Sequence, residues 1–176
     1  MRVSRSVGVL VVAVAGLAIF GALGRVRADD AASGSTDFSK VTPVDLVKQM
    51  PKGKIKDPYN DTQADIVQQG ETLFRSYSCS GCHGGTGGGG MCPPVTNDTW
   101  VYGGDDDTLF RLVALGSDEL QKAGYTRIGH ENVVGPMPPF GAIVKNADDL
   151  FKIIAFIRAH YSGDPPYKYG PPASQQ

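Results

Sequence analysis

The sequence offers little that would support a disulfide scaffold, a β-sheet or a repeat protein. It has three cysteines, an odd number, and two of them, Cys79 and Cys82, lie only three positions apart. A disulfide framework of the kind common in exported proteins does not explain that count. No segment alternates apolar and polar residues convincingly, as a half-buried strand would, and no repeat recurs along the chain. These absences leave a helical protein whose paired cysteines serve another purpose.

Long apolar runs are also absent, except near the N-terminus. A positively charged start, residues 1–5, precedes an apolar run over residues 7–23, which is the order of a secretory signal. Val26 and Ala28 have the spacing of the small residues before a signal-peptidase site, so we expect cleavage after Ala28. The alternative is an uncleaved membrane anchor, because the run is close to the length of about 17 residues that can just span a bilayer. The pattern predicts a periplasmic protein with residues 1–28 as its signal peptide.

The exported chain is short of basic residues. Cleavage after Ala28 leaves 148 residues, enough for one domain with one core. It removes four of the 17 basic residues and none of the 18 acidic ones, so the net charge becomes −5. An acidic surface is a poor complement to nucleic acid and allows a basic protein partner. We therefore expect no nucleic-acid binding.

What the sequence does contain divides the exported chain into three parts. Residues 29–61 are polar and punctuated by proline, with one short helical pattern in TPVDLVKQM, and are expected to form an N-terminal arm. Residues 167–176 have a similar character and are expected to form a C-terminal tail. Between them, residues 62–166 form the predicted folded domain, which should hold the chemistry.

The predicted domain contains three helical patterns. Thr62 can cap a helix that continues to about residue 77, and Gly70 within it indicates that another segment crosses close to its backbone. A second helix is expected over residues 106–115, ended by the glycine that follows, and a third over residues 146–160, with an asparagine cap and a broad apolar face. Three helices joined by long loops rich in glycine and proline are too little regular structure to be stable alone. The pattern therefore predicts an all-α domain with a large prosthetic group in its core.

The closely spaced cysteines belong to a chemically specific motif. Cys79-Ser80-Gly81-Cys82-His83 has the pattern C-x-x-C-H, the attachment sequence of c-type haem. Thiols at this spacing add to the two vinyl groups of haem, and the adjacent histidine can then reach the iron. A redox dithiol would need a βαβ pattern around it, and a zinc site a second pair of ligands. The motif predicts one covalent haem c, attached at Cys79 and Cys82, with His83 as an iron ligand.

The iron then needs a sixth ligand or an open position. Met137 lies in VVGPMPPFG, where prolines restrict the backbone and glycines permit turns. A preorganised loop reduces the entropy lost when a weak thioether binds iron, which favours Met137 over its main rival, His130. Met91 follows the haem motif too closely, Met50 precedes the first helix, and His160 is expected to be an ordinary residue of the last helical turn. Methionine and histidine together would leave no position for oxygen.

At this point the chain resembles a known family. C-S-G-C-H, CPPVTNDTW, and GPMPPFG before the terminal helix LFKIIAFIRAHYSGDPP are similar to the class I cytochromes c. The resemblance covers residues 62–166 and is closest to the cytochrome cL group, the electron acceptors of periplasmic quinoprotein methanol dehydrogenases, and within it to the acceptors of lanthanide-dependent enzymes. It implies a class I cytochrome c fold, with three main helices and long loops around one covalently attached haem.

The resemblance also implies roles for single residues. Met137 would be the distal ligand opposite His83, and Pro93 would supply the carbonyl that accepts a hydrogen bond from the proximal imidazole. Trp100 would lie against the haem edge and propionates, a place that a simple core tryptophan would also suit. Cys92 departs from the family pattern, where a glycine is common. We expect Cys92 to be a buried, inert thiol, and an intermolecular disulfide only if it is exposed.

Together these features predict an electron carrier and not an enzyme. The resemblance implies a PQQ-dependent methanol or alcohol dehydrogenase as electron donor and a second cytochrome or an oxidase as acceptor. The basic stretch from Lys40 to Lys56 and the insert GSDELQKAGYTRIGHEN are candidates for partner specificity, and both also suit ordinary solvated loops. Two other classes stay open. A membrane-anchored subunit of a respiratory complex would need residues 7–23 retained, and a haem enzyme or gas sensor would need an open sixth position.

Overall fold

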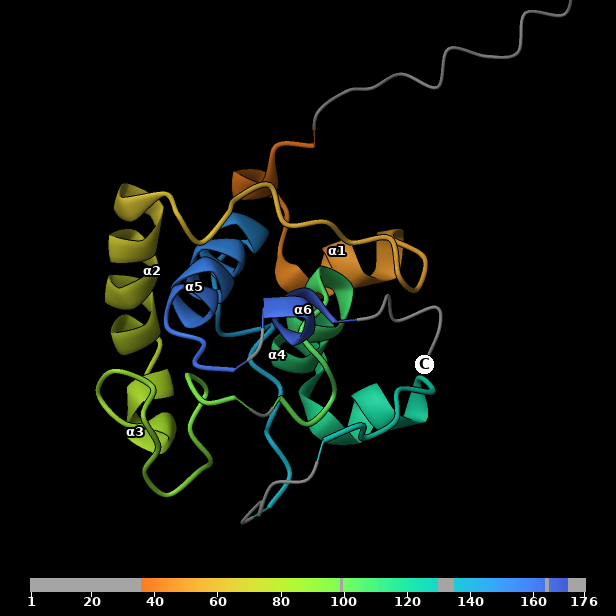
Figure 1. Ribbon diagram of the computed structural model, residues 1–176. Coiled ribbons are helices and arrows are strands. Elements are labelled where there is room, and N and C mark those ends of the chain that lie inside the picture. The colour runs from red at the N-terminus through yellow and green to blue at the C-terminus, as the bar shows by residue number, and fades with distance from the viewer. Residues whose placement is uncertain (1–35, 99, 130–134, 164, 171–176) are drawn as a thin grey trace, which may run out of the picture. The chain divides into compact units, whose positions relative to one another are not determined.

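The computed structural model of the protein describes residues 36–98, 100–129, 135–163 and 165–170 (Figure 1). Its elements in chain order are η1 (Phe38–Lys40), α1 (Pro43–Gln49), α2 (Ala64–Ser76), α3 (Cys79–His83), α4 (Asp106–Lys122), α5 (Ala147–Ala159) and α6 (Pro165–Tyr169). The expected all-α class is confirmed, since these residues form no strand. Among the described helices, none has both the length and the hydrophobicity to cross a membrane.

Helices α2 and α5 pack against each other at a glycine. A Cβ on Gly70 would lie only 2.0 Å from the carbonyl oxygen of Lys152 and 2.8 Å from the Cβ of Phe156. Phe74, one turn further along α2, packs against Phe156 with ring centroids 5.4 Å apart. The two backbones can approach this closely only because residue 70 has no side chain. The expected crossing at Gly70 is therefore confirmed.

Two helix boundaries differ from the prediction. Thr62 does not cap α2, because its hydroxyl donates to the Asn60 side chain at 2.6 Å and the helix begins after Gln63 without a side-chain cap. This local turn competes with helix capping for the threonine hydroxyl. Helix α4 does break at Gly116, where φ is 77°, but helical structure resumes and continues to Lys122. The second part of α4 was expected to be loop.

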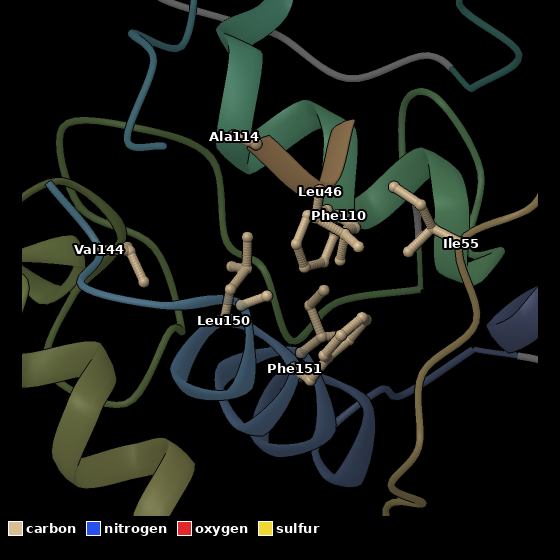
Figure 2. Close-up of a cluster of buried hydrophobic side chains, with 9 residues drawn as sticks. Leu46, Ile55, Phe110, Ala114, Val144, Leu150 and Phe151 are labelled. Atoms are coloured by element: carbon tan, nitrogen blue, oxygen red, sulfur yellow. The ribbon is translucent and has the colours of Figure 1, made fainter. Parts of the chain in front are cut away.

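Both segments that flank the predicted domain pack onto it in their described parts. Leu46 of α1 and Ile55 are 2% and 1% exposed and lie in the main apolar cluster with side chains of α4 and α5 (Figure 2). At the other end, the Arg158 guanidinium of α5 lies 4.8 Å from the centroid of the Tyr169 ring, and Lys168 of α6 pairs with Asp61. These residues of the predicted arm and tail belong to the folded unit and do not lie outside it.

A buried arginine fixes the segment after α1 to α4. The guanidinium of Arg111 donates to the carbonyls of Met50 at 2.7 Å and Pro51 at 3.0 Å, and it pairs with Asp107 at 2.8 Å. The Tyr125 hydroxyl donates to the same carboxylate at 2.5 Å. Burial opposes the charge on Asp107, but hydrogen bonds from Tyr125 and Arg111 outweigh it and lower the pKa of this carboxyl. The pair is therefore well satisfied and holds two parts of the fold in register.

A second buried arginine has two carboxylates as partners. Arg158 of α5 is 1% exposed and contacts Asp106 at 2.7 Å and Asp57 at 3.4 Å. Burial raises the pKa of Asp57 to about 7, against the opposing pull of the Tyr59 amide and of Arg158. Asp57 is the more distant partner, so the Arg158 guanidinium offsets the burial of this carboxyl only in part.

This arrangement predicts a pH dependence. Because the pKa of Asp57 is higher in the folded than in the unfolded state, its contribution to stability is full below about pH 4 and is lost as pH rises towards about 7. The wild type should therefore lose roughly 3–4 kcal/mol relative to Asp57→Asn between these limits, because a shift from 3.8 to about 7 is about three pKa units. Urea unfolding of both proteins across the range measures the difference. A difference that stays constant with pH would contradict the raised pKa.

Candidate functional site

A cavity of about 440 Å³ lies where the haem motif faces the loop that carries Met137. Its volume is within the usual range for ligand and cofactor sites, about 300–1,000 Å³. All six residues predicted to contact the cofactor line it: Cys79, Cys82, His83, Pro93, Trp100 and Met137. The remaining wall is mostly apolar: helices α2, α4 and α5 contribute side chains such as Phe74, Leu112 and Ile153, and loops contribute the rest. The fold thus brings together three segments that are distant in the sequence.

Helix α3 places the attachment motif in the cavity wall. Ser78 has a left-handed backbone, with φ of 64°, and turns the chain sharply from α2 into α3. Cys79 is buried, and burial raises the pKa of its thiol to about 11, while Cys82 is partly exposed. No disulfide joins Cys79, Cys82 and Cys92. Both motif thiols are therefore free to form thioether bonds.

The glycine-rich loop after α3 returns the chain to the histidine. Gly84 has φ of 81°, and a Cβ there would lie 2.2 Å from the carbonyl oxygen of Gly89. The Gly89 amide donates to the His83 carbonyl at 2.8 Å, and the Cys92 amide donates to the Cys82 carbonyl at 2.9 Å. These bonds satisfy carbonyls at the end of α3 that have no partner within the helix. They also place the next residue, Pro93, beside the imidazole.

His83 is oriented by Pro93. The imidazole Nδ1 lies 2.7 Å from the Pro93 carbonyl oxygen, which can only accept a hydrogen bond. The proton must therefore be on Nδ1, and the lone pair of Nε2 is left for a metal. The contact predicted for Pro93 is present, and it matches the way metal-binding histidines are usually held.

Met137 lies in the cavity wall at the broken part of α4. Its amide donates to Ser117 Oγ at 3.0 Å, and its carbonyl accepts from the Ser117 amide at 3.0 Å. Met50 instead packs with the main apolar cluster, and Met91 is 66% exposed. Among the methionines of the described residues, Met137 is therefore the one that faces the cavity.

The two other histidines, His130 and His160, are the remaining candidates for the sixth iron ligand. His160 ends α5, is exposed, and its Nδ1 lies 2.9 Å from the Phe156 carbonyl of its own helix. It does not line the cavity, in agreement with its expected place in the last helical turn. His130 lies outside the described residues.

Trp100 borders the cavity and is tied to the main chain. Its indole Nε1 donates to the Val95 carbonyl at 2.9 Å, and its ring packs against Tyr161 with centroids 4.6 Å apart. The ring is therefore held in place by the protein itself. This arrangement fits both expectations for Trp100, a tryptophan packed in the fold and an aromatic wall for a cofactor.

Polar residues of the second part of α4 also line the cavity, and the sequence did not single them out. Ser117 and Gln121 are the clearest, and the Gln121 amide donates to the Tyr102 hydroxyl at 2.8 Å. Arg127, just after the helix, joins them in the wall. The sequence predicts a loop after Gly116, because glycine commonly ends a helix. The serine and acidic residues that follow it are also a helix-start pattern, and helical structure does continue to Lys122.

The third cysteine lies at the cavity but has no predicted part in attachment. Cys92 is partly buried, and burial together with the neighbouring Cys82 thiol raises the pKa of its own thiol. A thiol with a raised pKa is a weak nucleophile at neutral pH. Cys92→Ala should therefore keep the wild-type haem content, measured by haem-peroxidase staining on a denaturing gel. Loss of covalent haem from this variant, with folding intact, would show that Cys92 takes part in attachment.

Comparison with known proteins decides the family. Residues 65–157, more than half of the chain, match the protein family described as cytochrome C oxidase, cbb3-type, subunit III. The chain belongs to this family of cytochrome c domains. The cytochrome therefore has the class I cytochrome c fold, carries covalently bound haem c, and is an electron-transfer protein.

Its relatives include subunits of larger assemblies. The cytochrome is 32% identical over 80 residues to the cbb3-type cytochrome c oxidase subunit FixP of Rhizobium meliloti (strain 1021), a match that covers 45% of this chain and 25% of FixP. It is 25% identical over 118 residues to the subunit CcoP of Azospirillum brasilense, covering 58% of this chain and 40% of CcoP. The matches thus span well under half the length of these relatives.

A solved structure, cytochrome cL from Hyphomicrobium denitrificans, is 26% identical to the cytochrome. It superimposes with a TM-score of 0.49 over 74% of this chain and 65% of the other.

The cavity lining fits a covalent haem c. The wall supplies two free thiols, an imidazole whose Nδ1 proton is already engaged by a carbonyl, and a thioether from a separate segment. Soft sulfur and imidazole donors suit iron, and the apolar remainder of the wall suits a porphyrin.

Proposed function

We propose that Cys79 and Cys82 attach the haem and that His83 and Met137 hold its iron in a carrier of single electrons. The observation that supports this most is that all four residues line one cavity. Bound haem c supplies one-electron redox chemistry at its iron. If an imidazole and a thioether take both axial positions, none is left for oxygen or peroxide. A haem enzyme or gas sensor, by contrast, needs an open position on the iron.

The protein's own residues then tune the carrier. The Pro93 carbonyl fixes the orientation of His83 and makes its Nε2 a stronger donor. A methionine opposite raises the reduction potential compared with a second histidine. Apolar walls that include Leu112, Ile153 and Ile157 limit the access of water to the centre of the cavity. A rigid, dry site keeps the rearrangement that accompanies each electron transfer small.

For the electron donor, we propose a PQQ-dependent methanol or alcohol dehydrogenase, and a downstream cytochrome or oxidase as the acceptor. The support is the resemblance of CPPVTNDTW and GPMPPFG to the cytochrome cL group. The exported form would begin after Ala28 and act in the periplasm. Its net charge of −5 would steer a transient encounter with a basic partner surface.

Stopped-flow reduction tests the donor. Oxidised cytochrome is mixed with purified quinoprotein methanol dehydrogenase that has been reduced by methanol, and haem reduction is followed optically. We expect saturable reduction that slows as salt is added, because electrostatic steering is screened. A quinoprotein glucose dehydrogenase serves as the control donor. Equal rates with both enzymes, or no reduction by the methanol enzyme, would reject this donor.

A second candidate is a membrane-anchored cytochrome subunit of a respiratory complex. The family match and the relatives FixP and CcoP, which are named as subunits of cbb3-type oxidases, favour it. This arrangement would require that residues 7–23 stay on the chain. Expression of the full chain separates the two candidates. Soluble protein that begins at Asp29 supports the periplasmic carrier, whereas retention in membranes together with a haem-copper oxidase supports the subunit.

A further inference from the structure

Helix α4 is broken where it meets the loop of Met137. Gly116 has φ of 77° and ψ of 166°, which removes the normal helical donors for the carbonyls of the preceding turn. Two of these carbonyls are satisfied by the loop instead. The Phe140 amide donates to Val113 at 2.9 Å, and the Gly141 amide donates to Ala114 at 3.0 Å. The break in the helix is therefore also the anchor of residues 137–141.

Ser117 completes this anchor at the methionine itself. Its amide donates to the Met137 carbonyl, and its hydroxyl oxygen accepts from the Met137 amide, both at 3.0 Å. One residue thus holds both polar groups of the Met137 backbone. Ser117 is 8% exposed, so water competes little for these bonds. Its side chain is small enough to lie between the helix and the loop.

Gly116 allows the loop to come this close. A Cβ at this position would lie 2.6 Å from the Met137 carbonyl oxygen and 2.9 Å from the Pro139 nitrogen. The positive φ also disfavours any other residue. Gly116 and Ser117 together therefore fix the position of the Met137 backbone in the cavity wall.

We propose that Ser117, supported by Gly116, is the positioning residue that keeps the Met137 thioether on the iron. This inference rests on the proposed function, because it requires Met137 to be the distal ligand. A thioether is a weak neutral ligand, and it outcompetes external ligands only when its backbone is held in place. The hydrogen bonds of Ser117 are made to the Met137 main chain and not to the cofactor. Ser117 acts through that main chain.

Three variants test the proposal in the haem-loaded protein. Ser117→Ala removes the acceptor for the Met137 amide, and Ser117→Thr keeps a hydroxyl. Ser76→Ala is the matched control, because Ser76 is also a helical serine but donates to the Thr72 carbonyl on the exposed side of α2. The measurement is the dissociation constant of imidazole for the ferric protein, with the near-infrared band of sulfur-to-iron ligation recorded alongside.

Imidazole should bind Ser117→Ala about tenfold more tightly than the wild type, which corresponds to ~1.4 kcal/mol less competition from Met137. The near-infrared band should weaken at a lower concentration of imidazole. Ser117→Thr and Ser76→Ala should stay within about twofold of the wild type. If Ser117→Ala proves too unstable, Ser117→Cys provides the same test, since a thiol sulfur is a weaker acceptor for the Met137 amide than a hydroxyl oxygen.

The outcomes separate this inference from the proposed function. A wild-type protein with the sulfur-to-iron band, and a Ser117→Ala variant that loses thermal stability but keeps the wild-type imidazole affinity, would overturn the positioning role alone. A wild-type protein without the band would overturn Met137 ligation itself, and the inference with it.

Discussion

Replacing Cys79 and Cys82 together by alanine should abolish covalent haem and leave the domain largely unfolded. The thiols are the predicted covalent links between the protein and the porphyrin, whereas His83 and Met137 would bind only the iron. Without the cofactor, a cavity of about 440 Å³ with mostly apolar walls remains inside the protein. The apolar side chains of that wall would then face water, at ~25 cal/mol for each Å² left exposed, so folding and haem attachment should fail together.

Haem-peroxidase staining after denaturing electrophoresis measures the attachment, and near-ultraviolet circular dichroism measures the loss of packed aromatic side chains. Cys92→Ala is the control for the removal of a thiol at the same cavity, and it should keep both signals. The single variants should keep one thioether and a reduced haem content. A stained band from the double variant would show that the motif is not where the haem is attached.

Replacing Met137 by alanine should open the sixth position of the iron without releasing the haem. The cavity would then have no thioether opposite His83, so the ferrous protein should bind carbon monoxide, which the wild type should resist. The reduction potential should fall, because a methionine ligand favours the reduced state. Optical titration with carbon monoxide and a redox titration measure the two effects.

Two controls make this result specific. Met91→Ala removes a methionine that is close in sequence to the haem motif but 66% exposed, and it should behave as the wild type. His130→Ala tests the main rival ligand. If His130→Ala opens the iron to carbon monoxide while Met137→Ala does not, then the histidine is the distal ligand and the assignment of Met137 is wrong.

The parts of the site that could be predicted from the sequence are those with a local cause. The C-x-x-C-H spacing acts within one helical turn, and the asparagine cap of α5 acts on the amide of Asp149, three residues later. The prolines and glycines around Met137 restrict the backbone locally. Gly70 predicts a close helix crossing, because glycine inside a helix lowers stability relative to alanine and is expected there only where another segment needs the space. In each case a few neighbouring residues determine the structure.

The rest depends on contacts between distant residues. Ile55 is a single apolar residue in a polar stretch, so no periodicity marks it as buried, yet it is 1% exposed. Arg111 and Arg158 would ordinarily be assigned to the surface, and their burial depends on partners 50 or more residues away, the Met50 carbonyl for Arg111 and the Gly104 carbonyl for Arg158. Ser117, Asp118 and Glu119 can start a helical segment, but nothing near Ser117 in the sequence marks its contact with Met137. Its role follows from the loop that returns 20 residues later.

The near-infrared magnetic circular dichroism of the oxidised wild-type protein tests the central claim most directly. If the His83 imidazole and the Met137 thioether hold the iron of a haem attached at Cys79 and Cys82, the wild type should show the band of sulfur-to-iron ligation. Met137→Ala should lose that band with the haem still covalently bound. A wild-type spectrum without the band, from protein that carries covalent haem, would contradict the proposed ligand pair and with it the closed, electron-carrying site.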